Sequence, residues 1–465
     1  MKKRLIVVLS AVLFLVGVSA ASETATDTAS EFKSTWKNPA PGFTTYGDIR
    51  LRQVYGWEWY LNNDTGTPGG KDGHHNFGRY RARIGEKVDI NEDVTFDVRL
   101  AWEFRAWDDP VDKDNHVDGD EAIIDRMNFT MRNLLNEPLT GVFGRQDITM
   151  NPWLIFDGTP YDGSRTMFFD ALRLTYDFED VETKVDMIYV DNRAEANDRL
   201  KPIGDEDLYL TEQDEHGAIL YLTNKSLQDT TLEGYFIYKN DNPIDEISKK
   251  MPASWSRKAE IYTFGGAVAG DIDLNWQYRV EGAVQTGDKD IDGGSVVDTK
   301  SLRAYGSNNY LKYKFNDEKK NSLRLDYEYL SGDDKGTDGR VEGFDTLWGE
   351  WPRFSELYVY TYAMEGIVGD LSNLHRTGLI HEFDPMGKMH FENGYQLLWA
   401  EENSTGPRFG GGLFRGQLLT SRLSYKFTKD LSGRLEAEYF IPGSYYDDNF
   451  RNNATFLRAE IVYSF

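Results

Sequence analysis

Apolar and polar residues alternate along much of this chain with a period of two. Between Leu274 and Gln285, every second residue is apolar or glycine, and most of the residues between them are polar or charged. The same alternation recurs from Phe96 to Arg105 and from Leu323 to Tyr329. Because successive side chains of a β-strand point to opposite faces, this pattern predicts strands with one apolar face and one charged face.

The connections between these segments alternate between short and long. Short turns are predicted near residues 91–93, 178–180, 270–272, 384–387 and 428–430. Longer polar stretches lie near residues 56–78, 107–121, 148–168, 191–215, 240–258, 287–300, 332–372, 402–413 and 442–453. Counting the segments between them gives 18 strands with both ends on the short-turn side. We therefore predict an all-β fold, a transmembrane antiparallel β-barrel of 18 strands with short periplasmic turns and long extracellular loops.

The start of the chain predicts export to the bacterial outer membrane. Lys2, Lys3 and Arg4 precede a short apolar run that ends in small residues around Ala20. Such a segment is typical of a cleaved signal peptide and is too short to span a bilayer as a helix. We predict a signal peptide over residues 1–20, a polar periplasmic leader over 21–44 and the transmembrane barrel over 45–465.

The last predicted strand alternates up to a terminal aromatic residue, Phe465. A terminal aromatic residue after such a strand resembles the signal that the outer-membrane assembly machinery recognises. The alternative is that this segment is the final strand of a soluble β-sandwich. The strands of such a sandwich would be rich in valine and isoleucine. The aromatic and charged faces found here favour the barrel.

Composition excludes several other classes of protein. The chain has no cysteine, so it has neither disulfides nor thiolate metal sites. Its net charge of -25 disfavours nucleic-acid binding, which usually requires a basic surface.

Three stretches carry a family resemblance. They are FGRQ at 143–146, FDALRLTY at 169–176, and FDTLW at 344–348 continuing through WPRFSELY at 351–358. Together they resemble the alginate export family of outer-membrane porins over roughly residues 46–465. The resemblance implies a monomeric 18-stranded barrel that passes an anionic sugar polymer along an arginine-lined constriction.

We accordingly expect a passive channel and not an enzyme, for hydrophilic, anionic oligo- or polysaccharides such as alginate. The alternatives are a general diffusion porin for small solutes, a structural barrel or adhesin without a channel, and, more distantly, an outer-membrane hydrolase. The expected partners are outer-membrane lipid and lipopolysaccharide and the saccharide solute. No cofactor is expected apart from a candidate structural calcium.

Arginines on the charged faces are the candidate lumen residues. On the predicted parity the inward-facing set is Arg50, Arg52, Arg79, Arg81, Arg83, Arg99, Arg145, Arg434 and Arg458. Further arginines could extend it: Arg173, Arg279, Arg303, Arg324 and Arg422. Planar guanidinium groups suit recognition of carboxylates, so these side chains could form one basic wall. The alternative is that carboxylates of the same faces pair with them and the arginines mainly support the barrel.

Two further groups are candidates for a ligand. Asp288, Asp290 and Asp292 have the spacing of the first half of a calcium loop, although the position of the bidentate glutamate is a threonine. The alternative is an acidic hairpin turn. In the longest loop, Trp348, Trp351 and Phe354 could stack on sugar rings or cover the pore, or could form a cluster that holds the loop on the barrel.

Overall fold

The computed structural model describes residues 37–59, 74–109, 121–151, 153–156, 168–194, 199–204, 213–244, 258–292, 297–334, 339–349, 353–359 and 372–465. Within these ranges, eighteen strands make the wall: β1 (Phe43–Trp57), β2 (His74–Asp89), β3 (Val94–Asp109), β4 (Ala122–Met131), β5 (Leu139–Gln146), β8 (Phe169–Phe178), β9 (Thr183–Asn192), β10 (Asp214–Leu227), β11 (Thr230–Asn242), β12 (Ala259–Asp271), β13 (Trp276–Asp292), β14 (Val297–Lys314), β15 (Ser322–Leu330), β17 (Leu374–Met386), β18 (Met389–Trp399), β19 (Phe414–Lys426), β20 (Leu431–Pro442) and β21 (Ala454–Ser464). Short elements in the connections are β6 (Thr149–Asn151), β7 (Ile155–Phe156), β16 (Arg340–Val341) and the 3-10 turns η2 (Leu134–Asn136), η3 (Glu179–Val181) and η4 (Asp448–Phe450).

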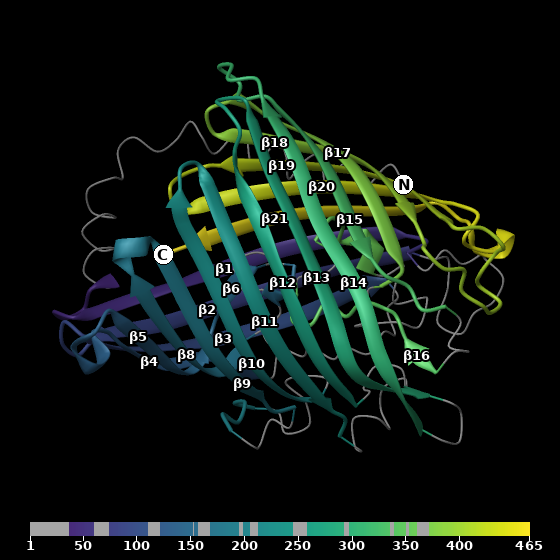
Figure 1. Cartoon of the computed structure of the whole chain (residues 1–465). Coiled ribbons are helices and arrows are strands. Elements are labelled where there is room, and N and C mark those ends of the chain that lie inside the picture. Colours follow the sequence, from purple (N-terminus) through teal and green to yellow (C-terminus); the bar gives the residue numbers. More distant parts are fainter. Residues whose placement is uncertain are drawn as a thin grey trace.

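The wall is a closed antiparallel barrel. Each of the eighteen strands pairs with its neighbour in sequence, and β1 pairs with both β2 and β21. At the junction, the backbone N–H of Gly47 donates to the carbonyl of Phe465 at 3.2 Å and the N–H of Phe465 donates to the carbonyl of Gly47 at 3.0 Å. Figure 1 shows the near strands β10–β14 running in a different direction from β1–β3 behind them, as the tilt of a barrel requires.

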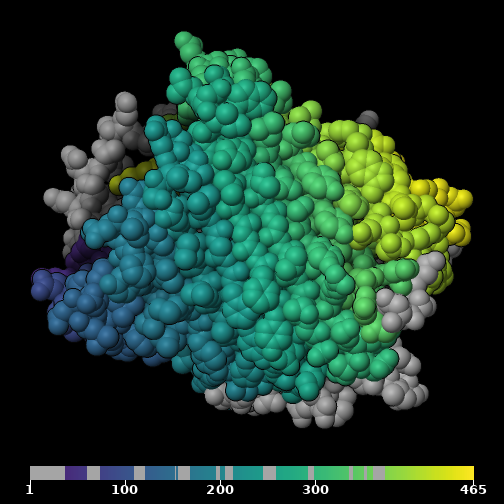
Figure 2. All heavy atoms as spheres, viewed as in Figure 1, coloured from purple at the N-terminus to yellow at the C-terminus, as the bar shows by residue number. Residues whose placement is uncertain are grey.

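Exposure along each strand is the reverse of that in a soluble protein. In β1, Ile49 and Leu51 are 45% and 50% exposed, whereas Arg50 and Arg52 between them are 0% and 3% exposed. Large apolar side chains are exposed on the outside of most other wall strands as well, and Figure 2 shows the outer face over β9–β14 as a closed surface. Apolar residues outside and charged residues inside are the arrangement of a barrel whose outer surface contacts lipid.

Aromatic rings gather near the short turns, where a bilayer meets water. The ring centroids of Phe96 and Phe129 are 4.9 Å apart, and those of Trp276 and Tyr313 are 4.8 Å apart. Aromatic side chains form girdles at the membrane interfaces of outer-membrane barrels, and these rings have the position of such a girdle.

A charge placed on the outer face should destabilise the barrel. Leu51→Arg, near the middle of β1, is expected to cost about 2–4 kcal/mol because the guanidinium group would face hydrocarbon. Leu274→Arg is the control, since Leu274 is 86% exposed in the turn between β12 and β13, and we expect it to change stability by less than about 0.5 kcal/mol. Urea-induced unfolding from lipid vesicles measures both, and equal effects would contradict a lipid-facing Leu51.

The strand count and the closed barrel predicted from the sequence are confirmed. The expected long loop at 287–300 is wrong, because β13 continues to Asp292 and β14 begins at Val297. The first strand begins at Phe43, two residues before the expected boundary. The predicted signal peptide and most of the leader lie outside the described residues. No helix in the described ranges is long and apolar enough to cross a membrane.

Candidate functional site

The arginines expected to form a basic wall lie on the inward-facing parity of their strands. Most of them are paired with carboxylates. Arg50 and Arg79 both contact Glu103, at 3.1 and 2.7 Å. Arg81 and Arg83 share Asp48, at 2.9 and 2.6 Å. The remaining members of this set bond as follows: Arg52 to Glu460, Arg99 to Asp125 and Asp147, Arg145 to Asp170, and Arg458 to Glu436 and Glu356. Arg434 lies opposite Glu460 in the β20–β21 register.

These pairs are almost completely buried. Within the predicted set, the Arg50, Arg145 and Arg458 side chains are at most 1% exposed, and Arg79 is 12% exposed. Forked hydrogen bonds join adjacent strands: Nε and Nη2 of Arg99 donate to the two carboxylate oxygens of Asp125 at 2.8 and 2.9 Å. Buried guanidinium groups with this many acceptors mainly brace the wall, which favours the structural alternative for this set.

The described parts of two loops lie inside the barrel against its wall. They are the β5–β8 loop (residues 147–168) and the β15–β17 loop (residues 331–373), described only in the ranges given above. Trp153 of the first stacks on Phe344 of the second with ring centroids 5.4 Å apart. Ile155 forms a parallel bridge with Trp348, and the backbone N–H of Trp348 donates to the carbonyl of Leu154 at 3.2 Å. The two loops therefore support each other inside the barrel.

Asp345 attaches the β15–β17 loop to β13. Its carboxylate lies 3.1 Å from the Lys289 ammonium, and its backbone N–H and carbonyl bond to the Gln285 side-chain amide at 2.8 and 2.7 Å. Burial on its own would raise the pKa of Asp345, but the ammonium groups of Lys289 and Lys239 outweigh it and lower that pKa. The carboxylate is therefore ionised at neutral pH, and its stabilising contribution weakens only as the pH falls into the acid range.

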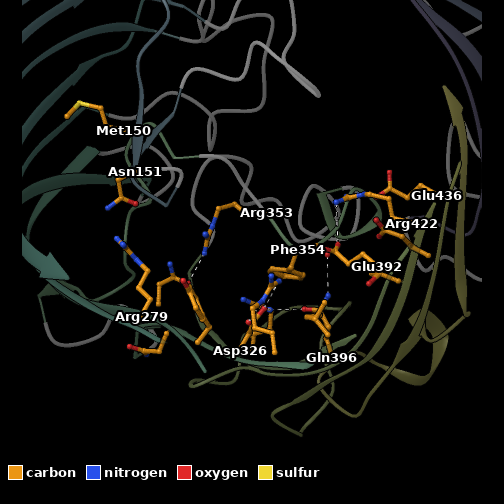
Figure 3. Close-up of a pocket in the computed structure, with 18 of the residues that line it drawn as sticks. Met150, Asn151, Arg279, Asp326, Arg353, Phe354, Glu392, Gln396, Arg422 and Glu436 are labelled. Atoms are coloured by element: carbon orange, nitrogen blue, oxygen red, sulfur yellow. Dashed lines mark hydrogen bonds and ion pairs between the residues drawn. The ribbon is translucent and has the colours of Figure 1, made fainter. Parts of the chain in front are cut away.

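A cavity of about 380 Å³ lies between the inward loops and wall strands from β11 to β20. Figure 3 shows Arg279, Asp326, Gln396 and Arg422 from the wall converging on it, with Arg353 and Phe354 reaching in from the β15–β17 loop. The side chains that line it are mainly polar: Met150, Asn151, Glu233, Arg279, Asn308, Asn309, Tyr310, Arg324, Asp326, Arg353, Phe354, Arg376, Ile380, Glu392, Gln396, Thr420, Arg422, Glu436 and Glu438. A polar solute would meet this part of the lumen.

Four of the five arginines that line the cavity are more exposed than the braced set, and the fifth, Arg376, is 5% exposed. The side chains of Arg279, Arg324, Arg353 and Arg422 are 18%, 27%, 23% and 33% exposed. Each also contacts a carboxylate, as Arg422 contacts Glu436 at 2.6 Å, yet Glu436 is only 2% exposed. Each of the four arginines thus has one partner acid that is less exposed than itself, whereas Glu233 and Glu392, which also contact Arg279 and Arg422, are 16% and 31% exposed. Guanidinium groups and these two carboxylates both face the space that a solute would occupy.

Arg279, Arg324 and Arg422, which the sequence offers as extensions of the arginine wall, line this cavity. Arg353 and Arg376 were not singled out, because Arg353 is in a loop and Arg376 is on a strand that lacks a clear alternation of apolar residues. The signal that could have found them is the density of arginine on the inward parity of β13, β15, β17 and β19. The two bond to a shared carboxylate, Glu328, at 3.4 and 3.0 Å.

The loop aromatics have different environments. Trp348 is 9% exposed, and its indole N–H donates to Glu215 at 2.9 Å, so it belongs to the cluster that holds the loop. Phe354 lines the cavity, with the Arg376 guanidinium 4.9 Å from its ring centre. Trp351 lies outside the described residues.

The candidate calcium ligands lie at the end of β13. Asp288 is opposite Glu260 in the register with β12, and Asp290 accepts a hydrogen bond from Thr299 of β14 at 2.6 Å. Among the residues that the structure describes, no group of three or more histidine and acidic side chains is arranged to hold a metal ion. Calcium binding at Asp288, Asp290 and Asp292 stays a prediction.

The family of this chain follows from a sequence comparison with known families. The model of one family, alginate export, matches residues 70–459, which is most of the barrel. The chain belongs to the alginate export family. A search of curated protein sequences with this chain finds no match.

Solved structures share its architecture at low sequence identity. OccK5 (OpdH) of Pseudomonas aeruginosa is 12% identical with a TM-score of 0.54, over 90% of this chain and 97% of that one. A BenF-like porin from Pseudomonas fluorescens Pf-5 is 11% identical with a TM-score of 0.52, over 90% and 98%. These likenesses show the fold alone. Alginate export family membership and the porin-type barrel together support an outer-membrane channel rather than an enzyme.

Proposed function

We propose that this outer-membrane channel passes anionic oligo- or polysaccharides of the uronate type by passive diffusion. The observation that carries the proposal is the cavity, where four arginines are 18–33% exposed and each contacts at least one acid that is less exposed than itself. A guanidinium fork donates two parallel hydrogen bonds to a carboxylate, which a uronate unit carries on every ring. Membership of the alginate export family supports the same class of solute.

Phe354 and Tyr310 add a second property that suits a saccharide. Both line the cavity among the arginines. The Arg376 guanidinium lies over one face of the Phe354 ring, so a sugar could contact the ring only where Arg376 does not cover it. Alternating charged donors and aromatic surface match the polar edge and the apolar face of a pyranose ring.

A general diffusion porin is the second candidate. It is favoured by the carboxylates that line the same cavity, Glu233, Asp326, Glu392, Glu436 and Glu438. Mixed charge of this kind would pass small ions of either sign with little preference. The two functions differ in whether a uronate chain binds inside the pore.

Single-channel recording in a planar bilayer separates them. Uronate oligosaccharides added to wild-type channels are expected to block the current at lower concentration than neutral oligosaccharides of equal length. Arg324→Gln should weaken uronate block about tenfold, because a charge-assisted hydrogen bond is worth about 1.5–3 kcal/mol. Equal block by the charged and the neutral oligosaccharide would leave the general porin as the function.

Arg173→Gln is the matched control for this measurement. Arg173 is also 27% exposed and also contacts a carboxylate, Asp186 at 2.8 Å, but it does not line the cavity. Its replacement should leave uronate block unchanged. A loss of block in Arg173→Gln as large as in Arg324→Gln would place the binding of saccharide elsewhere in the lumen.

A further inference from the structure

Glu438 of β20 is a cavity-lining carboxylate that bonds to a loop rather than to a base. Its oxygens accept hydrogen bonds from the Ser355 hydroxyl, from the backbone N–H of Glu356 at 3.0 Å and from the backbone N–H of Leu357 at 3.1 Å. Among the described residues, these hydrogen-bond partners all belong to one segment of the β15–β17 loop. Glu438 is 2% exposed, so the loop covers it.

The three donors lie at the start of a helical turn. Ser355 also accepts from the N–H of Tyr358 at 2.9 Å, so the serine caps the turn and the carboxylate completes the cap from the wall. Free N–H groups at the start of a turn carry partial positive charge, which a carboxylate stabilises. A strand residue therefore completes the cap that Ser355 begins.

The segment held by Glu438 carries two side chains of the cavity. Arg353 and Phe354 directly precede Ser355, and two residues of chain span at most about 7 Å. Both residues also contact the wall directly. The Arg353 guanidinium donates to Asn308 at 2.9 Å and pairs with Glu328 at 3.4 Å. The Phe354 carbonyl accepts from Gln396 at 3.2 Å, and the Arg376 guanidinium lies 4.9 Å from the ring. A displacement of Ser355 from β20 would therefore change the path of the chain that places both side chains among these partners.

We propose that Glu438 is a positioning residue that sets the place of Arg353 and Phe354 in the cavity, and through them the cross-section of the pore and its affinity for anionic saccharide. The affinity part of this inference rests on the proposed function, whereas the cross-section part does not. Glu438 acts through the loop and not by contact with the solute, because its oxygens are already occupied by loop donors.

If Glu438 acts only through its charge, its removal should strengthen uronate block; if it positions the loop, its removal should weaken uronate block. Glu392 also lines the cavity and is 31% exposed, with Arg422 at 3.5 Å. Glu392→Gln removes a negative charge without touching the loop, so uronate block should become stronger. Glu438→Ala removes the same charge but releases the loop, so uronate block should become weaker, by about tenfold for a displaced guanidinium contact. Glu438→Gln keeps one acceptor oxygen and should lie between wild type and Glu438→Ala.

Open-channel conductance in KCl without saccharide tests the cross-section independently. Glu438→Ala should raise it, by about one half or more, with added current noise, because the loop no longer holds its place in the lumen. Ser355→Ala removes one of the three donors and should shift both readouts in the same direction by less. If Glu438→Ala does not fold, Ser355→Ala tests the positioning role by the same two measurements.

Each outcome decides one question. If Glu438→Ala and Glu438→Gln strengthen block as Glu392→Gln does, and conductance is unchanged, Glu438 acts only as a charge and the proposal is overturned. If wild-type channels are not blocked by uronate but Glu438→Ala still raises conductance, the proposed substrate is wrong and the positioning role stands.

Discussion

Glu103→Ala is expected to lower the free energy of unfolding by about 3–5 kcal/mol, the largest stability effect of any substitution considered for this barrel. The Glu103 side chain is fully buried and neutralises two guanidinium groups, those of Arg50 and Arg79. Its removal leaves both cations inside the wall beside Arg52 and Arg81, which lie on neighbouring inward positions. Uncompensated buried charge costs far more than the loss of the pair itself. Equilibrium unfolding in urea from lipid vesicles gives the value.

The matched comparison is an ion pair at a periplasmic turn. Lys320 lies 3.0 Å from Asp384 and its side chain is 78% exposed. Lys320→Ala should change the free energy of unfolding by less than about 0.5 kcal/mol, because solvent screens exposed pairs. If Glu103→Ala costs no more than Lys320→Ala, the arginines of the first strands do not brace the wall.

Reversing two cavity arginines should produce the largest change in ion selectivity. Arg279→Glu combined with Arg422→Glu is expected to shift the chloride-to-potassium permeability ratio toward cations by about three- to tenfold, since wall charges act on ions through a screened Coulomb field. Both side chains face the cavity, at 18% and 33% exposure. The reversal potential across a bilayer in a KCl gradient measures the shift.

Arg81→Glu combined with Arg83→Glu provides the contrast. These two guanidinium groups share Asp48 and are 2% and 8% exposed, so the reversal would bring three carboxylates together inside the wall. We expect a poorly folded barrel rather than a selective one. Should this variant fold and shift the reversal potential more than the Arg279 and Arg422 variant, the selectivity of the channel would depend on the first strands.

The sequence predicts the barrel well because one rule governs every strand. Ile49, Arg50, Leu51 and Arg52 alternate in character, and the structure gives them alternating exposure. Parity assigns each residue to lipid or lumen without any knowledge of its neighbours, because a strand has only two faces. The end of β13 is the exception: the acidic residues Asp288, Asp290 and Asp292 suggest a loop, yet the ladder to β14 continues through Asp292.

The site is less predictable because it depends on partners far apart in the sequence. Parity places Arg50 and Arg422 equally in the lumen, but it does not reveal that Arg50 is fully buried and Arg422 is 33% exposed. That difference arises from how the β5–β8 and β15–β17 loops fold inward. The bond between Ser355 and Glu438 joins residues 83 positions apart, and no local pattern signals such a contact.

The backbone bonds between β1 and β21 constrain the order in which the molecule can be completed. Before β21 is in place, β1 carries a row of unpaired amide and carbonyl groups along one edge. Hydrocarbon offers these groups no hydrogen-bonding partner, so a partly built wall cannot rest stably in the bilayer. Entry into the membrane and the final pairing of β1 with β21 must therefore be coupled. Until then, the apolar side chains of the outer face require shielding from water.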